Sequence, residues 1–434
     1  MLAFDLIYQT NEEGAYANIR AQELLDDSTL DARDKALVTA IAYGTLRMQG
    51  KLDFLISQVS SREISSIDPK VKNLLRMGIF QLLYLRIAEH AAINETVQLT
   101  KKIAGDSKAS FVNAILRSIQ RLPDPEKAIE EGCKGDQLAF LSVNHSHPRW
   151  IVQSFYDQLR DWKSVEALLV ADNEPAEPHL VAWDGKSTVD ELVSEGAHVF
   201  PLTHHSVVSA KPPYEYRAIR ERRAGVQDAG SALCAEIFLS TRRETSLKMD
   251  WLDLCAGPGG KAAFLYNSLR ASHPEDTFIA NEISEHRAEL MVRNIPRDII
   301  RNFDGRDSKK FNSLFDRILV DAPCTGLGAL RRRPEARWRR EINDLKALVS
   351  LQRELLDSAY ELLRAGGVIA YVTCSPHLME TKAQVLDFLH RHREAALIPI
   401  TMPGVPVQKD GTLQLWTHRD GTDSMYMALI QKPD

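Results

Sequence analysis

The chain has 434 residues, of which 44% are hydrophobic and 26% charged, and its formal net charge is −5. This length exceeds one ordinary hydrophobic core, so we expect a globular protein of two or three domains. No apolar run approaches the roughly 18 residues that span a bilayer, and the five cysteines show neither a CxxC pair nor a metal-ligand spacing. A membrane protein, a zinc module and a disulfide framework are therefore disfavoured, and the odd number of cysteines favours a reducing cytoplasm.

Residues 1–125 are predicted to be helical almost throughout. Apolar residues recur three and four positions apart over 36–46, 71–85 and 111–119, without the alternation of a strand. Asp68-Pro69 is typical of a helix start, because aspartate caps free N–H groups and proline is tolerated in the first turn. The segment 122–125, which contains two prolines, ends this predicted helical bundle.

Residues 126–223 carry weaker patterns. An amphipathic helix is predicted near Trp150–Leu159, and the apolar run Leu180–Trp183 favours a short strand. We expect a small mixed α+β subdomain that links two larger domains. A basic run ends this zone and is either a solvated surface or a nucleic-acid contact; it consists of Arg217, Arg220, Arg222 and Arg223.

From residue 224 to residue 434, short apolar runs alternate with helical stretches. The runs that favour buried parallel strands are Asp250–Leu254, Thr277–Ala280, Arg317–Val320 and Gly367–Val372. Helices are predicted near Ala262–Leu269, Glu285–Arg293 and Leu345–Leu363, with Gly366-Gly367 as the stop of the last helix. This order indicates a doubly wound α/β domain, whose ligands bind at the carboxyl ends of the strands.

A glycine-rich loop follows the first of these strands. It consists of Cys255, Ala256, Gly257, Pro258, Gly259, Gly260 and Lys261. Glycines at such a turn let the backbone approach a ligand closely, although a tight turn can also need them for geometry alone. The next strand ends at Glu282, whose carboxylate can accept both hydroxyls of a ribose. The dinucleotide pattern GxGxxG and the phosphate-loop pattern GxxxxGK[ST] are both absent here.

Two cysteines follow later strand-like runs of the same domain. Cys324 ends the segment Asp321-Ala322-Pro323-Cys324, and Cys374 is the centre of Thr373-Cys374-Ser375. A single cysteine after a strand is usually a small core residue. Two cysteines among polar, turn-forming residues, downstream of a cofactor-type loop, favour covalent catalysis instead.

An arginine-rich segment begins shortly after Cys324. Residues 331–340 contain six arginines and one glutamate, a local charge of +5, and a tryptophan lies among them. Such a run can be a solvated helix face, but the indole offers a surface on which a base can stack. We therefore predict a nucleic-acid contact formed by Arg331, Arg332, Arg333, Arg337, Trp338 and Arg340.

Leu252–Lys261, Asp321–Cys324 and Thr373–Ser375, in this order, resemble motifs of the S-adenosylmethionine-dependent RNA cytosine-C5 methyltransferases. Val226–Ser231 is similar to the segment that enters the catalytic domain of that family. Residues 1–125 resemble the NusB-like RNA-binding domain of its RsmB branch. The resemblance implies an all-α NusB-like domain over 1–125, a small α+β linker subdomain over 126–223, and a Rossmann-like class I methyltransferase domain over 224–434.

The resemblance also implies roles for the cofactor residues. The loop from Cys255 to Lys261 would hold the methionine part of S-adenosylmethionine, and Glu282 its ribose. Asp304 would lie beside the adenine, and Asp321 between the cofactor and the base. One departure is that the ribose position holds Glu282 where aspartate is commoner. Without the resemblance, Asp304 is equally a turn residue.

For catalysis, the resemblance implies that Cys374 is the nucleophile. Cytosine C5 is too weak a nucleophile to attack a methyl sulfonium directly, so a thiolate must first add to C6. Asp321 would hold the N3 edge of the base, and Cys324 would help remove the C5 proton. Cys324 is the competing nucleophile, because the nucleophile of thymidylate-type and DNA cytosine enzymes follows a proline. A second departure is that Pro376–Thr381 follows Thr373–Ser375 where many relatives have a Pro-Glu-Glu-Asn type segment, and Glu380 is the equivalent acid.

The resemblance implies a cytoplasmic monomer that acts on small-subunit (16S) ribosomal RNA and has no membrane partner. A cytosine of a transfer RNA or of large-subunit ribosomal RNA is the alternative substrate, because the catalytic motifs are shared among targets. An RNA-binding protein with an inert methyltransferase domain is disfavoured, because the glycine loop and both cysteines are intact.

Overall fold

Residues 1–242 and 247–434 are described by the computed structural model, and their contacts divide into two units. The first unit contains Met1–Glu174 and Leu330–Arg340, and the second contains Pro175–Ala329 and Glu341–Asp434. Within the part of the chain so described, no helix has the length and apolar character needed to cross a bilayer.

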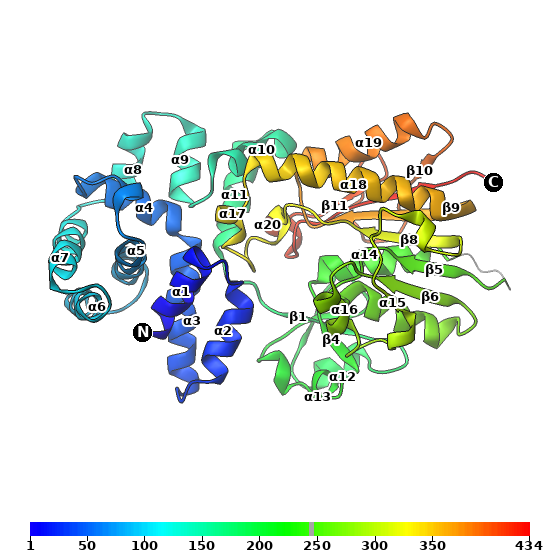
Figure 1. The fold of residues 1–434 in the computed structure, drawn as a ribbon, viewed down its shortest axis with the longest axis horizontal. Coiled ribbons are helices and arrows are strands. Elements are labelled where there is room, and N and C mark those ends of the chain that lie inside the picture. The colour runs from blue at the N-terminus through cyan, green and yellow to red at the C-terminus, as the bar shows by residue number, and fades with distance from the viewer. Residues whose placement is uncertain (243–246) are drawn as a thin grey trace. The chain divides into compact units, whose positions relative to one another are not determined.

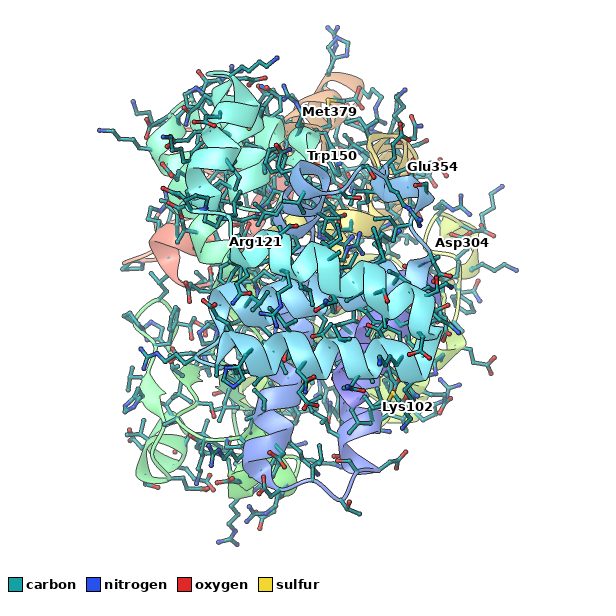
Figure 2. The ribbon with its side chains drawn as sticks, turned by 90° about the vertical axis from the view of Figure 1, so that its left-hand side faces the viewer. Lys102, Arg121, Trp150, Asp304, Glu354 and Met379 are labelled. Carbon is teal, nitrogen blue, oxygen red and sulfur yellow. The ribbon has the colours of Figure 1, made fainter. Side chains whose placement is uncertain are left out.

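The first unit is helical, as predicted. Its helices are α1 (Leu2–Glu12), α2 (Ala17–Asp26), α3 (Ala32–Arg47), α4 (Gln49–Val59), α5 (Pro69–Tyr84), α6 (Glu89–Ala104), α7 (Asp106–Gln120), α8 (Pro125–Cys133), α9 (Gln137–Asn144), α10 (Arg149–Leu159), α11 (Trp162–Asn173) and α17 (Ala336–Arg339). The carboxylate of Asp68 accepts hydrogen bonds from the N–H groups of Lys70 and Val71, so it caps α5 as predicted. Figure 2 looks onto α6 and α7, which pack side by side, with Lys102 and Arg121 near their ends.

The structure divides the middle zone differently from the predicted subdomain over 126–223. Helices α8 to α11 belong to the first unit, where α8 and α9 pack against α4. The remainder forms an antiparallel sheet in the second unit, in the order β2-β3-β1-β4. Its strands are β1 (His179–Ala182), β2 (His198–Val199), β3 (Ser206–Val208) and β4 (Ala224–Val226). The boundary lies after Glu174, because the helices before it bury their apolar faces among other helices while β1 pairs with β4.

The second unit also contains a larger, mixed sheet in the order β10-β12-β9-β8-β5-β6-β7, with β11 beside β12. The strands are β5 (Asp250–Asp253), β6 (Thr277–Asn281), β7 (Ile300–Arg301), β8 (Phe315–Asp321), β9 (Leu363–Thr373), β10 (Ala396–Ile398), β11 (Leu413–Gln414) and β12 (Tyr426–Gln431). Strands β5 to β9 pair in parallel, whereas β12 runs antiparallel to both β9 and β10. The carboxyl ends of β5, β6, β8 and β9 therefore meet at one edge of the sheet.

Helices cover both faces of this sheet. They are α14 (Ala229–Ser240), α15 (Gly260–Ser272), α16 (Glu285–Met291), α18 (Ile342–Leu362) and α19 (Lys382–Arg391). Neighbouring strand residues point to opposite faces: Trp251 packs in one apolar cluster with Phe264 of α15, whereas Leu252 packs in another with Leu356 of α18 and Phe388 of α19. In Figure 1, α18 lies along β8 and β9. This layering confirms the predicted α/β domain.

The end of α18 differs from the prediction. The helix ends at Leu362, and Gly366 lies within β9 instead of terminating the helix. The N–H of Gly366 donates to the carbonyl of Lys432 at 3.1 Å, and its φ is +70°. The glycine is therefore needed for a local turn of the backbone inside the strand.

Candidate active site

The glycine loop lies against the predicted ribose-binding acid. It connects the end of β5 to Gly260, where α15 begins. The N–H of Gly257 donates to the carboxylate of Glu282 at 3.1 Å. A Cβ atom on Gly257 would lie 2.2 Å from Glu282 Oε2, so a larger residue could not keep this contact. The N–H of Ser284 donates to the other carboxylate oxygen of Glu282 at 2.9 Å. The glycine loop and Glu282 therefore lie in direct contact at one edge of the sheet.

Asp253 is a further acid of this edge that sequence reasoning did not select. It is the last residue of β5 and is fully buried. Within residues 1–242 and 247–434, neither carboxylate oxygen of Asp253 has a hydrogen-bond partner. Burial, together with the nearby charge of Asp321, raises the pKa of Asp253 to about 8. Its place inside the motif Leu252–Lys261 was the signal that could have identified it.

Lys261 joins the glycine loop to the first cysteine motif. Its ammonium lies 2.8 Å from a carboxylate oxygen of Asp321, the last residue of β8. Burial alone disfavours the charge on Lys261, but the Asp321 carboxylate outweighs this effect and raises the pKa of the lysine. The two predicted site residues therefore form a partly buried ion pair between neighbouring strand ends.

Asp304 lies near this edge but on a more exposed segment. Its carboxylate forms an ion pair with Arg306 at 2.6 Å, and Figure 2 labels its position. A Cβ atom on the following Gly305 would lie 3.2 Å from Cγ of Leu254, directly before the glycine loop. Asp304 therefore lies near the glycine loop in space, although its own contacts are those of a turn residue.

The two candidate cysteines meet across the ends of adjacent strands. Strands β8 and β9 are parallel neighbours, and the N–H of Ala322 donates to the carbonyl of Val372 at 2.9 Å. This pairing brings the sulfur atoms of Cys324 and Cys374 to 3.3 Å from each other. Parallel neighbours end at the same edge of a sheet, so two motifs far apart in sequence form one site.

Gly328 fixes the loop that follows Cys324. Its N–H donates to the carbonyl of Cys374, and its carbonyl accepts from the N–H of Ser424, both at 2.9 Å. A Cβ atom at this position would lie 2.1 Å from the carbonyl oxygen of Ser424. Only glycine therefore fits between these two segments, and sequence reasoning did not identify it.

The pKa values of the two thiols are shifted in opposite directions. The hydrogen bond between them lowers the pKa of Cys374, and Lys261 adds to this effect against burial and the charge of Asp321. The same hydrogen bond raises the pKa of Cys324 well above its usual value, and burial adds to the shift. When the pair loses its first proton, the two sulfur atoms therefore share the remaining proton across their 3.3 Å contact.

Arg337 does not form the predicted contact with nucleic acid. It belongs to the first unit and is fully buried. Its guanidinium donates to the side-chain oxygen of Asn173 at 2.8 Å and to the carbonyls of Ser146 and Asp172 at 3.2 Å. Burial lowers the pKa of Arg337 to about 9. The sequence pattern indicated an exposed charge, but the guanidinium of Arg337 is buried and donates to acceptors on distant segments of the chain.

The rest of the arginine-rich segment is mixed in exposure. Trp338 packs on α4, where a Cβ atom on Gly50 would lie 2.4 Å from its ring. Arg332 and Arg333 are exposed, and Arg331 and Arg340 are partly exposed. Contacts of these four arginines with RNA stay predictions.

Acids accompany the second basic run, near residue 220. Arg223 pairs with Glu191 at 2.5 Å and with Glu221 at 2.8 Å. Arg217 also pairs with Glu221, at 2.7 Å. These ion pairs favour the reading of a solvated surface over a strongly positive patch.

Comparisons with known proteins agree with the fold. The family model described as "16S rRNA methyltransferase RsmB/F" matches residues 239–431, and the NusB family model matches residues 1–121. The protein MT1451 of Mycobacterium tuberculosis is 40% identical over 99% of this chain and 95% of its own length. The "Ribosomal RNA small subunit methyltransferase B" of Salmonella paratyphi B is 31% identical over 92% of this chain and 91% of its own. The crystal structure of PH0851 covers 99% of this chain and 98% of its own with a TM-score of 0.80; at 22% identity it supports the fold.

Proposed function

Because the chain belongs to the RsmB/F family of 16S rRNA methyltransferases, we propose that it methylates C5 of a cytosine in small-subunit ribosomal RNA through a covalent adduct. The observation that carries this proposal is the pair of cysteine sulfurs, 3.3 Å apart beside the glycine loop. A methyltransferase acting on amino groups would not need a paired thiol at this edge of the sheet.

The residues around the loop fit S-adenosylmethionine, the methyl donor of this family. Asp253, Glu282 and Asp321 surround the loop with carboxylates, and such a group suits a ligand that carries sulfonium and ammonium charges. The buried oxygens of Asp253, which lack hydrogen-bond partners within the described residues, are free to accept from such a ligand. When bound, S-adenosylmethionine supplies an electrophilic methyl carbon.

The proposed chemistry assigns different steps to the two cysteines. The Cys374 thiolate forms a bond to C6, and the electron pair of the C5–C6 double bond makes C5 nucleophilic. Asp321 holds the N3 edge while this charge develops. Once C5 carries the new methyl group, Cys324, which has released its own proton to solvent, takes the C5 proton. The electrons of that C–H bond restore the double bond and expel the Cys374 thiolate, so the enzyme is regenerated.

The names of the relatives favour small-subunit ribosomal RNA over the alternative substrates. A ribosomal RNA substrate would also agree with a cytoplasmic location. A transfer RNA or large-subunit cytosine would use the same residues. An inert domain is disfavoured, because the glycine loop, the paired cysteines and the Lys261–Asp321 ion pair are all in place.

Bisulfite sequencing of total RNA tests this proposal. A strain without the gene is complemented either with the wild-type gene or with the Cys374→Ala variant. We expect one cytosine of 16S ribosomal RNA to lose methylation in the deletion strain, and only the wild-type gene to restore it. Loss of methylation at a transfer RNA cytosine, with 16S ribosomal RNA unchanged, would contradict the assigned substrate.

A further inference from the structure

Glu380 is a buried acid that lies behind the cysteine pair. It ends the short helix η6 (Leu378–Glu380), shortly after Cys374, and its side chain is fully buried. In the part of the chain that the structure describes, no basic side chain forms an ion pair with it. Burying a carboxylate without a cation is costly, so its retention needs a compensating arrangement of donors.

Neutral donors surround the Glu380 carboxylate. One oxygen accepts from the N–H of Thr325 at 2.8 Å and from the side-chain amide of Gln352 at 3.1 Å. The other oxygen accepts from the hydroxyl of Thr325 at 2.5 Å. Each of these groups donates to the carboxylate, so both of its buried oxygens are hydrogen-bonded. The arrangement therefore holds a negative charge directly behind the residue that follows Cys324.

The same network fixes both cysteine segments. Gln352, on α18, also donates to the carbonyl of Pro323 at 2.9 Å, so Cys324 is held on both sides. The hydroxyl of Thr325 lies 3.1 Å from that of Ser375, the residue after Cys374. The buried phenol of Tyr371 donates to the backbone carbonyl of Glu380 at 2.8 Å. The network thus sets the relative position of the two sulfur atoms.

The charged and titratable groups around the pair are distributed unevenly. Lys261, Asp321 and Asp423 act on Cys374. Glu380 acts on Cys324, and it raises the pKa of that thiol in addition to the larger effects of the Cys374 hydrogen bond and of burial. The neighbouring Tyr371 phenol is itself buried, and its pKa is raised by burial and then by Glu380. Cys374 therefore faces Asp423 and the Lys261–Asp321 ion pair, whereas Cys324 faces Glu380, which forms no ion pair within the described residues.

We propose that Glu380 is a positioning residue whose buried charge keeps the shared proton on Cys324, so that the thiolate resides on Cys374. The inference rests on the proposed function, in which Cys374 attacks the base. It explains how two hydrogen-bonded cysteines keep separate roles, because an anion behind Cys324 opposes a second negative charge there. The same charge makes Cys324 a stronger base once it is deprotonated.

Competitive alkylation of the intact protein tests the proposal. Isotopically distinct iodoacetamide labels both cysteines, and mass spectrometry gives the initial rate at each. We take the ratio of the Cys374 rate to the Cys324 rate at pH 7 and divide it by the same ratio at high pH, where both thiols are ionised. This normalised ratio removes the difference in accessibility between the two cysteines. In the wild-type protein we expect this normalised ratio to be about tenfold or more, since one unit of pKa difference corresponds to a factor of ten.

Two variants separate charge from packing. Glu380→Gln keeps the shape of the side chain but removes its charge, and we expect the normalised ratio to fall by about fivefold or more. The matched control Tyr371→Phe removes a hydroxyl that donates to the Glu380 backbone carbonyl but leaves every donor of the Glu380 carboxylate, so its ratio should stay within about twofold of the wild type. An unchanged ratio in Glu380→Gln, or an equal fall in both variants, would overturn the proposal.

The wild-type protein provides a test that does not depend on the folding of any variant. A normalised ratio below one would assign the thiolate to Cys324 and overturn the inference. Because alkylation needs neither RNA nor cofactor, this outcome is independent of the substrate. Failure to find 5-methylcytosine would overturn the proposed function and leave the thiol measurement standing.

Discussion

Cys324 and Cys374 are the same residue type 3.3 Å apart, yet their neighbours give them different chemistry. The hydrogen bond between the thiols lowers the pKa of Cys374, and Lys261 adds to this effect against Asp321 and Asp423; the same hydrogen bond, burial and then Glu380 raise the pKa of Cys324. An asymmetric field of this kind lets one thiol attack a base while the other retains a proton. The catalytic assignment therefore depends on residues outside the two cysteine motifs.

Asp253 gives a prediction at the same scale. Its pKa is about 8 in the folded protein against 3.8 for an ordinary aspartate. The folded chain therefore binds this proton more tightly than the unfolded chain, and the stability it confers is lost as pH rises from about 4 to 8. The Asp253→Asn variant needs no proton at this position. In thermal unfolding without cofactor, we expect it to be more stable than the wild type at pH 8 by roughly several °C.

This difference should disappear at pH 4, where Asp253 is protonated in the folded protein. A variant that is less stable than the wild type at pH 8 would contradict the raised pKa of the buried Asp253. Equal stability at both pH values would contradict it as well.

Among the elements, the segment Leu330–Arg340 has an unexpected place. In sequence it lies between β8 and α18 of the second unit, but it packs as part of the helical first unit. The chain thus passes from the Cys324 loop directly into that unit and returns at Glu341. Arg337 anchors the segment, because its planar guanidinium can donate to several fixed acceptors at once.

The anchor gives a stability prediction. Arg337→Met keeps much of the length of the side chain but leaves the acceptors on Ser146, Asp172 and Asn173 without this donor. We expect a loss of about 1–3 kcal/mol in the free energy of unfolding, the cost of buried groups that lose a hydrogen bond. The measurement is denaturant unfolding followed by circular dichroism.

Arg333→Met is the matched control, because Arg333 is exposed in the same segment. Its effect should stay within about 0.5 kcal/mol, as for other surface substitutions. Equal losses in the two variants would show that Arg337 does not anchor the segment.

For the whole molecule, the sequence predicts most where local pattern and strand order decide the structure. Apolar spacing identified the helices of the first unit and the strands that support the site. The predicted parallel sheet also indicated that ligands bind at the carboxyl ends of its strands, and the glycine loop, Asp321 and both cysteines follow those ends. Family resemblance then supplied the chemistry that spacing alone left open.

The remaining features depend on contacts between distant segments. The acceptors of Arg337 lie on residues 146, 172 and 173, far from it in sequence. The arginine-rich segment around Arg337 therefore indicated an exposed side chain, whereas the fold buries it. The antiparallel β12 and the division of residues 126–223 follow from tertiary packing. The role of Glu380 requires knowing that Thr325 and Gln352 point toward it. Contacts of Arg331, Arg332, Arg333 and Arg340 with RNA stay predictions.

The central claim is that Cys374 forms the covalent bond to cytosine and Cys324 is needed to break it. The most direct test incubates each alanine variant with 16S ribosomal RNA and S-adenosylmethionine and separates the products on a denaturing gel. We predict that Cys324→Ala accumulates a covalent protein–RNA complex, because the adduct forms but cannot resolve, and that Cys374→Ala forms neither complex nor methylated product. A complex that accumulates with Cys374→Ala and is absent with Cys324→Ala would contradict the account.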